Sequence, residues 1–140
     1  MNGLFNTTYL IIAVVLVLLV VALASVLAKK RFAKLDIERF MTRWKEVQGL
    51  CGQENTWPLA VINADKVLDE ALKKSHFKGK TMGERLVAAQ HAITDNDGVW
   101  FGHKLRNKLV HEDYANLTKK EVMRALNGFR QALRDLGALK

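Results

Sequence analysis

The sequence predicts an all-α protein, in which an N-terminal transmembrane helix is followed by a four- to five-helix up-and-down bundle. Residues 9–28 form an apolar run without a single charge. The rest of the chain repeats its apolar residues at helical spacing, has one proline and shows no sustained alternation of apolar and polar residues. With 140 residues in all, the chain has room for one compact domain after the apolar run and not for two.

The apolar run begins at Tyr9, ends at Ala28 and has the length of a membrane span. At about 1.5 Å per residue such a helix reaches roughly 30 Å, the thickness of the hydrocarbon core of a bilayer. The eight residues before it contain no Lys or Arg, whereas a cleaved signal peptide carries a positive n-region. We therefore expect an uncleaved single-pass transmembrane helix.

The basic residues that follow the span predict its orientation. They form a flank over residues 29–34, made of Lys29, Lys30, Arg31 and Lys34. Basic flanks stay on the cytoplasmic side and attract anionic lipid. We expect a protein of the cell (inner) membrane, with residues 1–8 outside as a short extracytoplasmic N-terminus and residues 35–140 forming a cytoplasmic bundle.

Charge and cysteine content set broad limits on function. The flank supplies +4 of the formal net charge of +8, which leaves +4 for residues 35–140. This mild excess is compatible with RNA binding but is not specific to it. Cys51 is the one cysteine, so the chain has no intramolecular disulfide, in agreement with a reducing cytoplasm. We interpret Cys51 as a small apolar side chain near a helix end.

The first helix of the bundle is expected over residues 32–50, where it can continue the transmembrane helix without a break. Gly49 and Gly52 end it. Asn55 or Thr56 can cap the next helix, which has Pro58 in its first turn. The polar face of this second helix is interpreted as a solvated face with an i,i+4 ion pair, not as a pair of catalytic acids; it holds Asp65, Lys66, Asp69 and Lys73.

Capping signals place the remaining helices. Thr81 and Glu84 form a capping box after a tight connection at residues 78–80, and Thr118 and Glu121 form a second one. Between them, residues 95–98 are expected to be a turn and residues 99–111 a helix. The last helix stops at Gly137, a typical C′ residue. The apolar stripes predict a core that includes Phe40, Trp44, Val61, Leu68, Leu86, Leu105, Leu126, Phe129 and Leu133.

Two apparent ligand motifs fail on spacing. Gly79-Lys80-Thr81 resembles the end of a phosphate-binding loop, but the required earlier glycine is Lys74, and a helix rather than a strand precedes it. The four histidines contain no i,i+4 pair, so we expect no metal site and no cofactor.

The helix over residues 99–111 carries the chemistry. His103, Asn107 and His111 recur at i, i+4 and i+8, with Arg106 one step away. Arginine offers a permanently charged fork of donors to phosphate oxygens, and histidine moves protons near neutral pH. Together these residues suit metal-free cleavage of RNA, in which His111 takes the ribose 2′-hydroxyl proton and Arg106 stabilises the charge on the phosphoryl oxygens.

The segment from Arg106 through Asn107 to His111 resembles the R-x4-6-H signature of the HEPN (higher eukaryote and prokaryote nucleotide-binding) superfamily, including the polar residue after the arginine. The resemblance implies a four- or five-helix bundle and, in many members, a metal-independent endoribonuclease that pairs two motifs in a homodimer. Arg106 and His111 would then be catalytic, with Asn107 and His103 supporting them. Other members are RNA-binding or scaffold modules without catalysis. The chain also resembles small uncharacterised bacterial membrane proteins with an N-terminal anchor.

Two alternatives stay open at this point. In the first, the cluster is structural: Arg106 pairs with Glu112 or Asp113, and His111 stabilises the C-terminus of its helix, where a cation is favoured. In the second, the protein is not an enzyme but a membrane-tethered module that docks a partner protein. The side-chain environment of Arg106 and His111 distinguishes these alternatives from a nuclease. A nuclease requires both side chains to face an open cleft, whereas a structural role requires them to be bound to protein acceptors.

Overall fold

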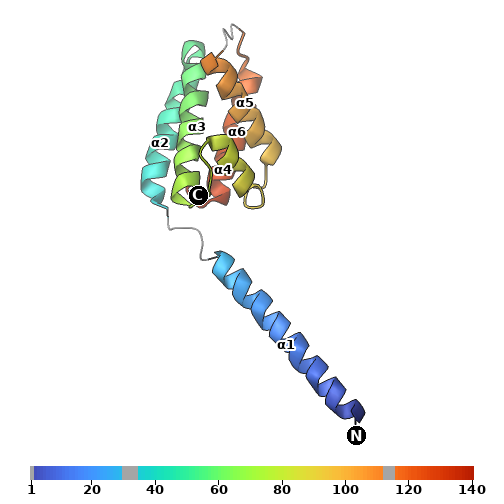
Figure 1. The fold of residues 1–140 in the computed structure, drawn as a ribbon. Coiled ribbons are helices and arrows are strands. Elements are labelled where there is room, and N and C mark those ends of the chain that lie inside the picture. Colours follow the sequence, from blue (N-terminus) through green and yellow to red (C-terminus); the bar gives the residue numbers. More distant parts are fainter. Residues whose placement is uncertain (1, 30–34, 112–115) are drawn as a thin grey trace. The chain divides into compact units, whose positions relative to one another are not determined.

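The computed structural model describes residues 2–29, 35–111 and 116–140, and these residues contain helices and connections but no strand. The chain divides into two compact units, Met1–Phe32 and Ala33–Lys140. Figure 1 shows a single helix in the first unit and a bundle in the second. The predicted all-helical class and the helical bundle are confirmed.

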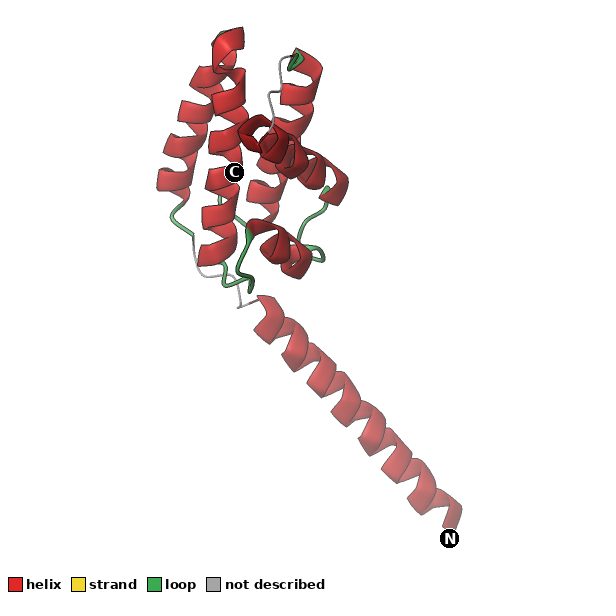
Figure 2. Ribbon diagram, turned by 45° about the horizontal axis from the view of Figure 1, so that its top comes forward, coloured by secondary structure: helices red, strands yellow, loops and turns green. Residues whose placement is uncertain are grey.

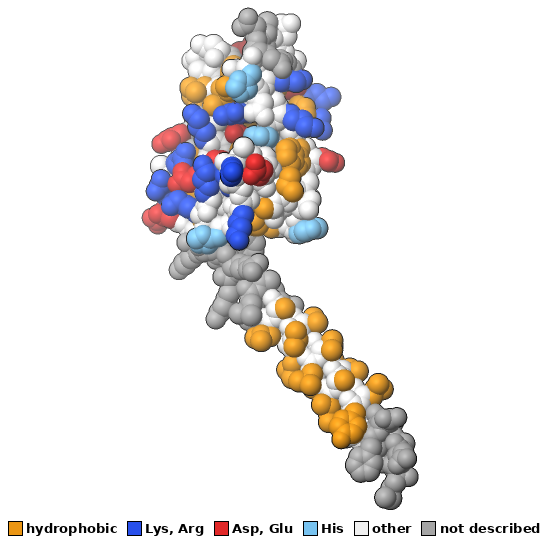
Figure 3. All heavy atoms as spheres, in the orientation of Figure 1, with side chains coloured by type: hydrophobic (Ala, Val, Ile, Leu, Met, Phe, Trp, Pro, Cys, Tyr) orange, Lys and Arg blue, Asp and Glu red, His pale blue; other side chains and the backbone are white. Residues whose placement is uncertain are grey.

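The first unit consists of α1 (Asn2–Lys29). Its described side chains, those of residues 8–24, are all exposed and mostly apolar (Figure 3). Of the predicted basic flank, Lys29 ends this helix, and Lys30, Arg31 and Lys34 lie outside the described residues.

The structure does not support the predicted N-terminal transmembrane helix. Among the residues that the structure describes, no helix combines the length and the apolar character needed to cross a membrane.

The second unit places α3 at its centre (Figures 1 and 2). α3 contacts every other helix of the unit, and α5 also packs along α6. α2 and α3 run in opposite directions, as do α5 and α6 (Figure 1). The five helices are α2 (Ile37–Gly49), α3 (Trp57–Lys74), α4 (Met82–Ala89), α5 (Asn96–His111) and α6 (Lys119–Asp135), and two single 3₁₀ turns, η1 (Leu50–Gly52) and η2 (Glu54–Thr56), join α2 to α3.

The core of this unit agrees with the predicted apolar stripes. All nine side chains named from the sequence are buried, and Phe40, Leu68 and Phe129 are fully so. The predicted core is therefore confirmed. Burying side chains of this size contributes about 1.5–3 kcal/mol each relative to leaving them exposed.

Capping residues move two helix starts away from the predicted positions. The Asp36 carboxylate accepts a hydrogen bond from the Arg39 amide at 3.1 Å, and α2 begins at Ile37 rather than continuing from a preceding helix. The Asp95 carboxylate likewise accepts from the Gly98 amide at 2.9 Å, so α5 begins at Asn96, inside the segment that was expected to be a turn. In both cases an acidic side chain satisfies an amide that the first helical turn leaves unpaired.

The other predicted caps differ in detail. The box formed by Thr118 and Glu121 is present as predicted. Thr81 accepts from the Glu84 amide, but the Glu84 carboxylate binds the amide of Lys80 at 2.7 Å instead of that of Thr81. Thr56 precedes α3 without a capping hydrogen bond, while a proline does lie in the first turn of α3 as expected.

Glycines allow α5 and α6 to approach closely. A Cβ atom on Gly128 would lie 2.3 Å from the carbonyl carbon of Gly98, and one on Gly102 would lie 2.6 Å from the ring of Phe129. Such distances leave no room for a methyl group on this side of α5. The close contact fixes the apolar side of α5 against α6, and its polar side contributes to a pocket shared with α3 and α4.

Candidate functional site

The pocket is organised around Asp65 of α3, which is only 3% exposed. Asp65 follows Val61 by four residues and precedes Leu68 by three, and both of these are fully buried. It therefore lies on the inward stripe of α3, because residues at these spacings share one face of a helix. The predicted solvated face is wrong for Asp65 for this reason.

Two side chains of α5, an imidazole and a guanidinium, contact the Asp65 carboxylate. Nδ1 of His103 lies 2.8 Å from Oδ1, and Nε of Arg106 lies 3.5 Å from Oδ2. The side chain of His103 is 13% exposed and that of Arg106 is 27% exposed. Burying a carboxylate is costly unless it is paired and hydrogen-bonded, and these two contacts supply the pairing.

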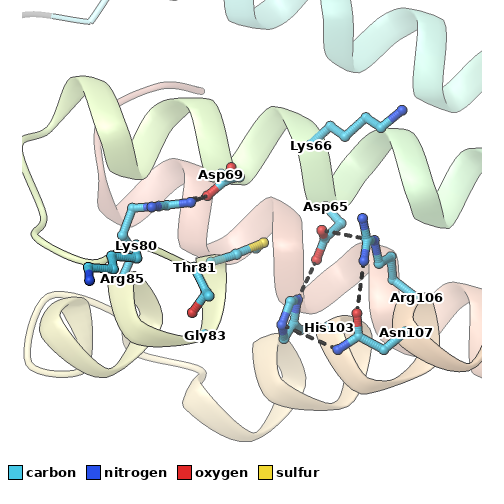
Figure 4. A pocket seen from close by; sticks show the side chains of 11 residues that line it. Asp65, Lys66, Asp69, Lys80, Thr81, Gly83, Arg85, His103, Arg106 and Asn107 are labelled. Atoms are coloured by element: carbon cyan, nitrogen blue, oxygen red, sulfur yellow. Dashed lines mark hydrogen bonds and ion pairs between the residues drawn. The ribbon is translucent and has the colours of Figure 1, made fainter. Parts of the chain in front are cut away.

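Asn107 closes this arrangement into a ring of four side chains (Figure 4). Its Oδ1 accepts a hydrogen bond from Nη1 of Arg106 at 2.9 Å, and its amide nitrogen lies 3.5 Å from Nε2 of His103. We name the set formed by Asp65, His103, Arg106 and Asn107 the polar ring. Residues that are 38 positions apart in the chain are thus joined by direct contacts.

The polar ring lines a pocket of about 460 Å³ between α3, α5 and the start of α4. This volume falls within the range of small-ligand sites in proteins. The remaining lining residues come from α3, from α4 and from the connection between them, and they are Lys66, Asp69, Lys80, Thr81, Met82, Gly83 and Arg85.

Arg85 holds the opposite wall of the pocket in place. Its Nε donates to Oδ1 of Asp69 at 2.8 Å, and its Nη1 donates to the carbonyl oxygen of Gly79 at 2.6 Å. Its side chain is 7% exposed, so this is a largely buried ion pair. Loss of one partner from such a pair leaves an uncompensated charge, and the pair therefore fixes α4 and the preceding loop to α3.

The pocket carries an excess of positive charge. Four Lys and Arg side chains and two Asp side chains line it. Both carboxylates already have partners, Asp65 in the polar ring and Asp69 with Arg85 and Lys73. Lys66 and Lys80 are exposed, and within the described part of the chain neither takes part in an ion pair. The site is electrostatically suited to an anion.

Three of the four side chains predicted for the site meet in this pocket. His103, Arg106 and Asn107 line it, whereas His111 is exposed at the last turn of α5 and does not. At about 100° per residue, positions 106 and 111 point some 140° apart around a helix axis. The predicted alternative partners of Arg106, Glu112 and Asp113, lie outside the described residues, and Arg106 contacts Asp65 instead.

The pocket residues that were not predicted from the sequence come from α3, from α4 and from the connection between them. Asp65 and Arg85 both occupy apolar stripes of their helices, and a charged residue in such a stripe is a detectable signal for a buried ion pair. Nothing comparable in the sequence pointed to Lys66 and Lys80 as pocket residues, because isolated surface lysines are common on any basic domain.

Comparisons with the models of known protein families, with curated proteins and with solved structures gave no match to this chain. The HEPN resemblance therefore depends on the motif that runs from Arg106 to His111.

Proposed function

We propose that the helical unit is an HEPN-like RNA-binding domain in which Arg106 contacts a backbone phosphate. The observation that carries the proposal is the position of Arg106 at the edge of an open, positively charged pocket. One of its donors, Nη1, binds Asn107, and its buried Nε lies beside the Asp65 carboxylate, 3.5 Å from Oδ2. A guanidinium group has five N–H donors, so donors remain for a bidentate contact with phosphate oxygens.

The two exposed lysines extend this interaction to a polyanion. Lys66 follows Asp65 on α3, and Lys80 precedes α4 on the other wall, so both flank the pocket that contains Arg106. Cations of this kind neutralise neighbouring phosphates of one strand and release counterions, which favours a nucleic acid over a single small anion. The net charge of +4 on residues 35–140 acts in the same direction.

Equilibrium binding of a fluorescent single-stranded RNA, followed by anisotropy, tests this proposal. The full chain is kept in a non-ionic detergent because the described side chains of α1, those of residues 8–24, are exposed. We expect Arg106→Ala to weaken binding about tenfold and to reduce the dependence of log K on log salt by about one unit. Arg130→Ala is the matched control, since it removes the same charge from an exposed site on α6.

Two results would contradict the proposal. Equal weakening in Arg106→Ala and Arg130→Ala would show that net charge, and not the pocket, determines affinity. Loss of 1–3 kcal/mol of stability in Arg106→Ala, with no RNA bound by the unsubstituted chain, would instead assign the polar ring a purely structural role. Urea unfolding of the same variants therefore accompanies the binding measurement.

A further inference from the structure

The contact between Asp65 and His103 determines which ring nitrogen carries the proton. An ionised carboxylate only accepts hydrogen bonds, so Nδ1, 2.8 Å from Oδ1 of Asp65, is the protonated nitrogen. Nε2 of the neutral ring then keeps its lone pair and can act as a base. A T-shaped contact with the ring of Trp100, with centroids 6.0 Å apart, further restricts the imidazole.

Nε2 faces the pocket rather than the core. It lies 3.5 Å from the amide nitrogen of Asn107, a distance too long for a strong hydrogen bond. On the α4 side it faces Gly83, where a Cβ atom would lie 3.9 Å from Nε2. A side chain longer than alanine at this position would therefore cover the nitrogen, and glycine leaves it accessible.

Arg106 lies beside the same carboxylate, with Nε 3.5 Å from its second oxygen. Figure 4 shows the Asp65 carboxylate in contact with both the His103 ring and the Arg106 guanidinium, so a phosphate bound by Arg106 would lie close to this ring. A base that is oriented by a carboxylate and lies next to an arginine-bound phosphoryl group is the arrangement that proton transfer and charge stabilisation require.

We propose that Asp65 and His103 form a catalytic dyad that cleaves the RNA bound at this pocket, with His103 as the base and Asp65 as the positioning residue. The inference rests on the proposed RNA binding. It assigns proton transfer to His103, whereas the motif resemblance implies His111.

The reaction is an internal transesterification. The proton of the ribose 2′-hydroxyl moves to Nε2 of His103, the 2′-oxygen forms a bond to phosphorus, and the bond from phosphorus to the 5′-oxygen breaks. The 5′-oxygen leaves with the electron pair and takes a proton from water, and the imidazolium returns its proton to the hydroxide that remains. The products are a 2′,3′-cyclic phosphate and a 5′-hydroxyl, while Arg106 stabilises the charge on the non-bridging oxygens.

Single-turnover cleavage of an end-labelled RNA by the full chain, in EDTA and at saturating protein, tests the dyad. We expect His103→Ala to lower the cleavage rate by about 10²–10⁴-fold while the Kd for RNA changes less than threefold. Added imidazole should restore part of the activity, which a merely structural histidine would not show. The control is His91→Ala, an exposed histidine outside the pocket, and an RNA with a 2′-deoxy sugar at the cleavage site should stay intact.

Two further variants separate positioning from chemistry. Asp65→Asn keeps the size of the side chain but can donate to Nδ1, which favours the wrong ring tautomer; we expect at least a tenfold lower rate without imidazole-dependent rescue. Gly83→Leu should block cleavage by covering Nε2, yet its unfolding midpoint should not fall, because leucine is a better helix former than glycine.

The outcomes distinguish this inference from the proposed function. If the chain binds RNA without cleaving it, or if His111→Ala abolishes cleavage and His103→Ala does not, the dyad is overturned and RNA binding stands. If the chain binds no RNA, the proposed function fails, and the dyad fails with it.

Discussion

At the scale of single residues, Asp65 sets the chemistry of the pocket. A carboxylate in the inward stripe of α3 must have partners, and the two that it has are His103 and Arg106. A leucine at the same position would suit the core better, since hydrophobic replacements of buried ion pairs are often neutral or stabilising. The carboxylate at this position orients the His103 ring, which the proposed dyad requires.

His76 is a residue whose backbone conformation disagrees with its identity. It has a φ of 62°, in the left-handed region that favours glycine, and it follows the last turn of α3. The amides of His76 and Phe77 bind the carbonyl groups of Lys73 and Leu72, so the helix ends in a Schellman motif. We expect His76→Gly to raise the free energy of unfolding by about 0.5–1 kcal/mol, because glycine adopts this conformation without strain.

Gly137 provides the opposite substitution for the same measurement. It ends α6 with a φ of 74°, and a Cβ atom there would meet nothing within 4 Å. Gly137→Ala should therefore lower the free energy of unfolding by about 1 kcal/mol through backbone strain alone. Urea titrations followed by circular dichroism measure both variants, and a His76→Gly variant no more stable than the parent would show that its side chain makes a compensating contribution.

Cys51 is expected to be a slow nucleophile in the folded protein. Partial burial raises the pKa of its thiol, because desolvation disfavours the thiolate. The contribution of the protonated thiol to folding stability is fully present below the pKa of Cys51 in the unfolded state. It is lost as the pH rises through the higher pKa of Cys51 in the folded state. At mildly alkaline pH, iodoacetamide should therefore alkylate Cys51 more slowly in the native protein than in urea, and equal rates would contradict this expectation.

At the scale of elements, the contact between α5 and α6 determines where the polar face of α5 points. Gly128→Ala would place a Cβ atom 2.3 Å from the backbone of Gly98, and backbone cannot move aside as a flexible side chain can. We expect a loss of about 1–3 kcal/mol from overpacking. The matched control is Gly49→Ala in α2, where a Cβ atom meets nothing within 4 Å and alanine should stabilise by up to about 1 kcal/mol. A neutral Gly128→Ala variant would mean that the two helices separate at little cost.

The helices and their buried faces were predictable because each depends on residues close together in the sequence. The Thr118 capping box and the stripe through Leu126, Phe129 and Leu133 are examples. Boundaries set by a single acidic cap were not predicted: Asp36 and Asp95 look like ordinary linker residues until their carboxylates are seen to accept helix amides.

The site was predictable on one wall only. Periodicity placed His103, Arg106 and Asn107 together, because all three lie on α5. It cannot show which residues of α3 and α4 face them, since that depends on how the helices pack. The i, i+4, i+8 spacing also included His111 in the cluster. Because an α-helix has 3.6 and not 4 residues per turn, however, His111 is rotated away from the pocket.

At the scale of the whole molecule, the two units differ in whether their apolar side chains are buried. The described apolar side chains of α1 are exposed, whereas the buried core is built from side chains between Leu35 and Leu139. The pocket likewise draws all its lining residues from the second unit. Both the core and the candidate site are therefore complete within residues 35–140, as far as the structure describes them.

We expect a fragment of residues 35–140 to fold cooperatively and to bind RNA as the full chain does. Its free energy of unfolding should lie within about 1 kcal/mol of the value for the second unit in the full chain, because single domains of this size unfold as one unit and no described core side chain is removed. Thermal unfolding followed in the near-ultraviolet region reports directly on Trp44, Trp57 and Trp100, all of which belong to this fragment. A broad transition, or a fragment that keeps its helix content without a near-ultraviolet signal, would show that the core needs residues 1–34. RNA affinity equal to that of the full chain would place the binding determinants in the fragment, and a weaker affinity would assign part of the binding to the basic residues that precede it.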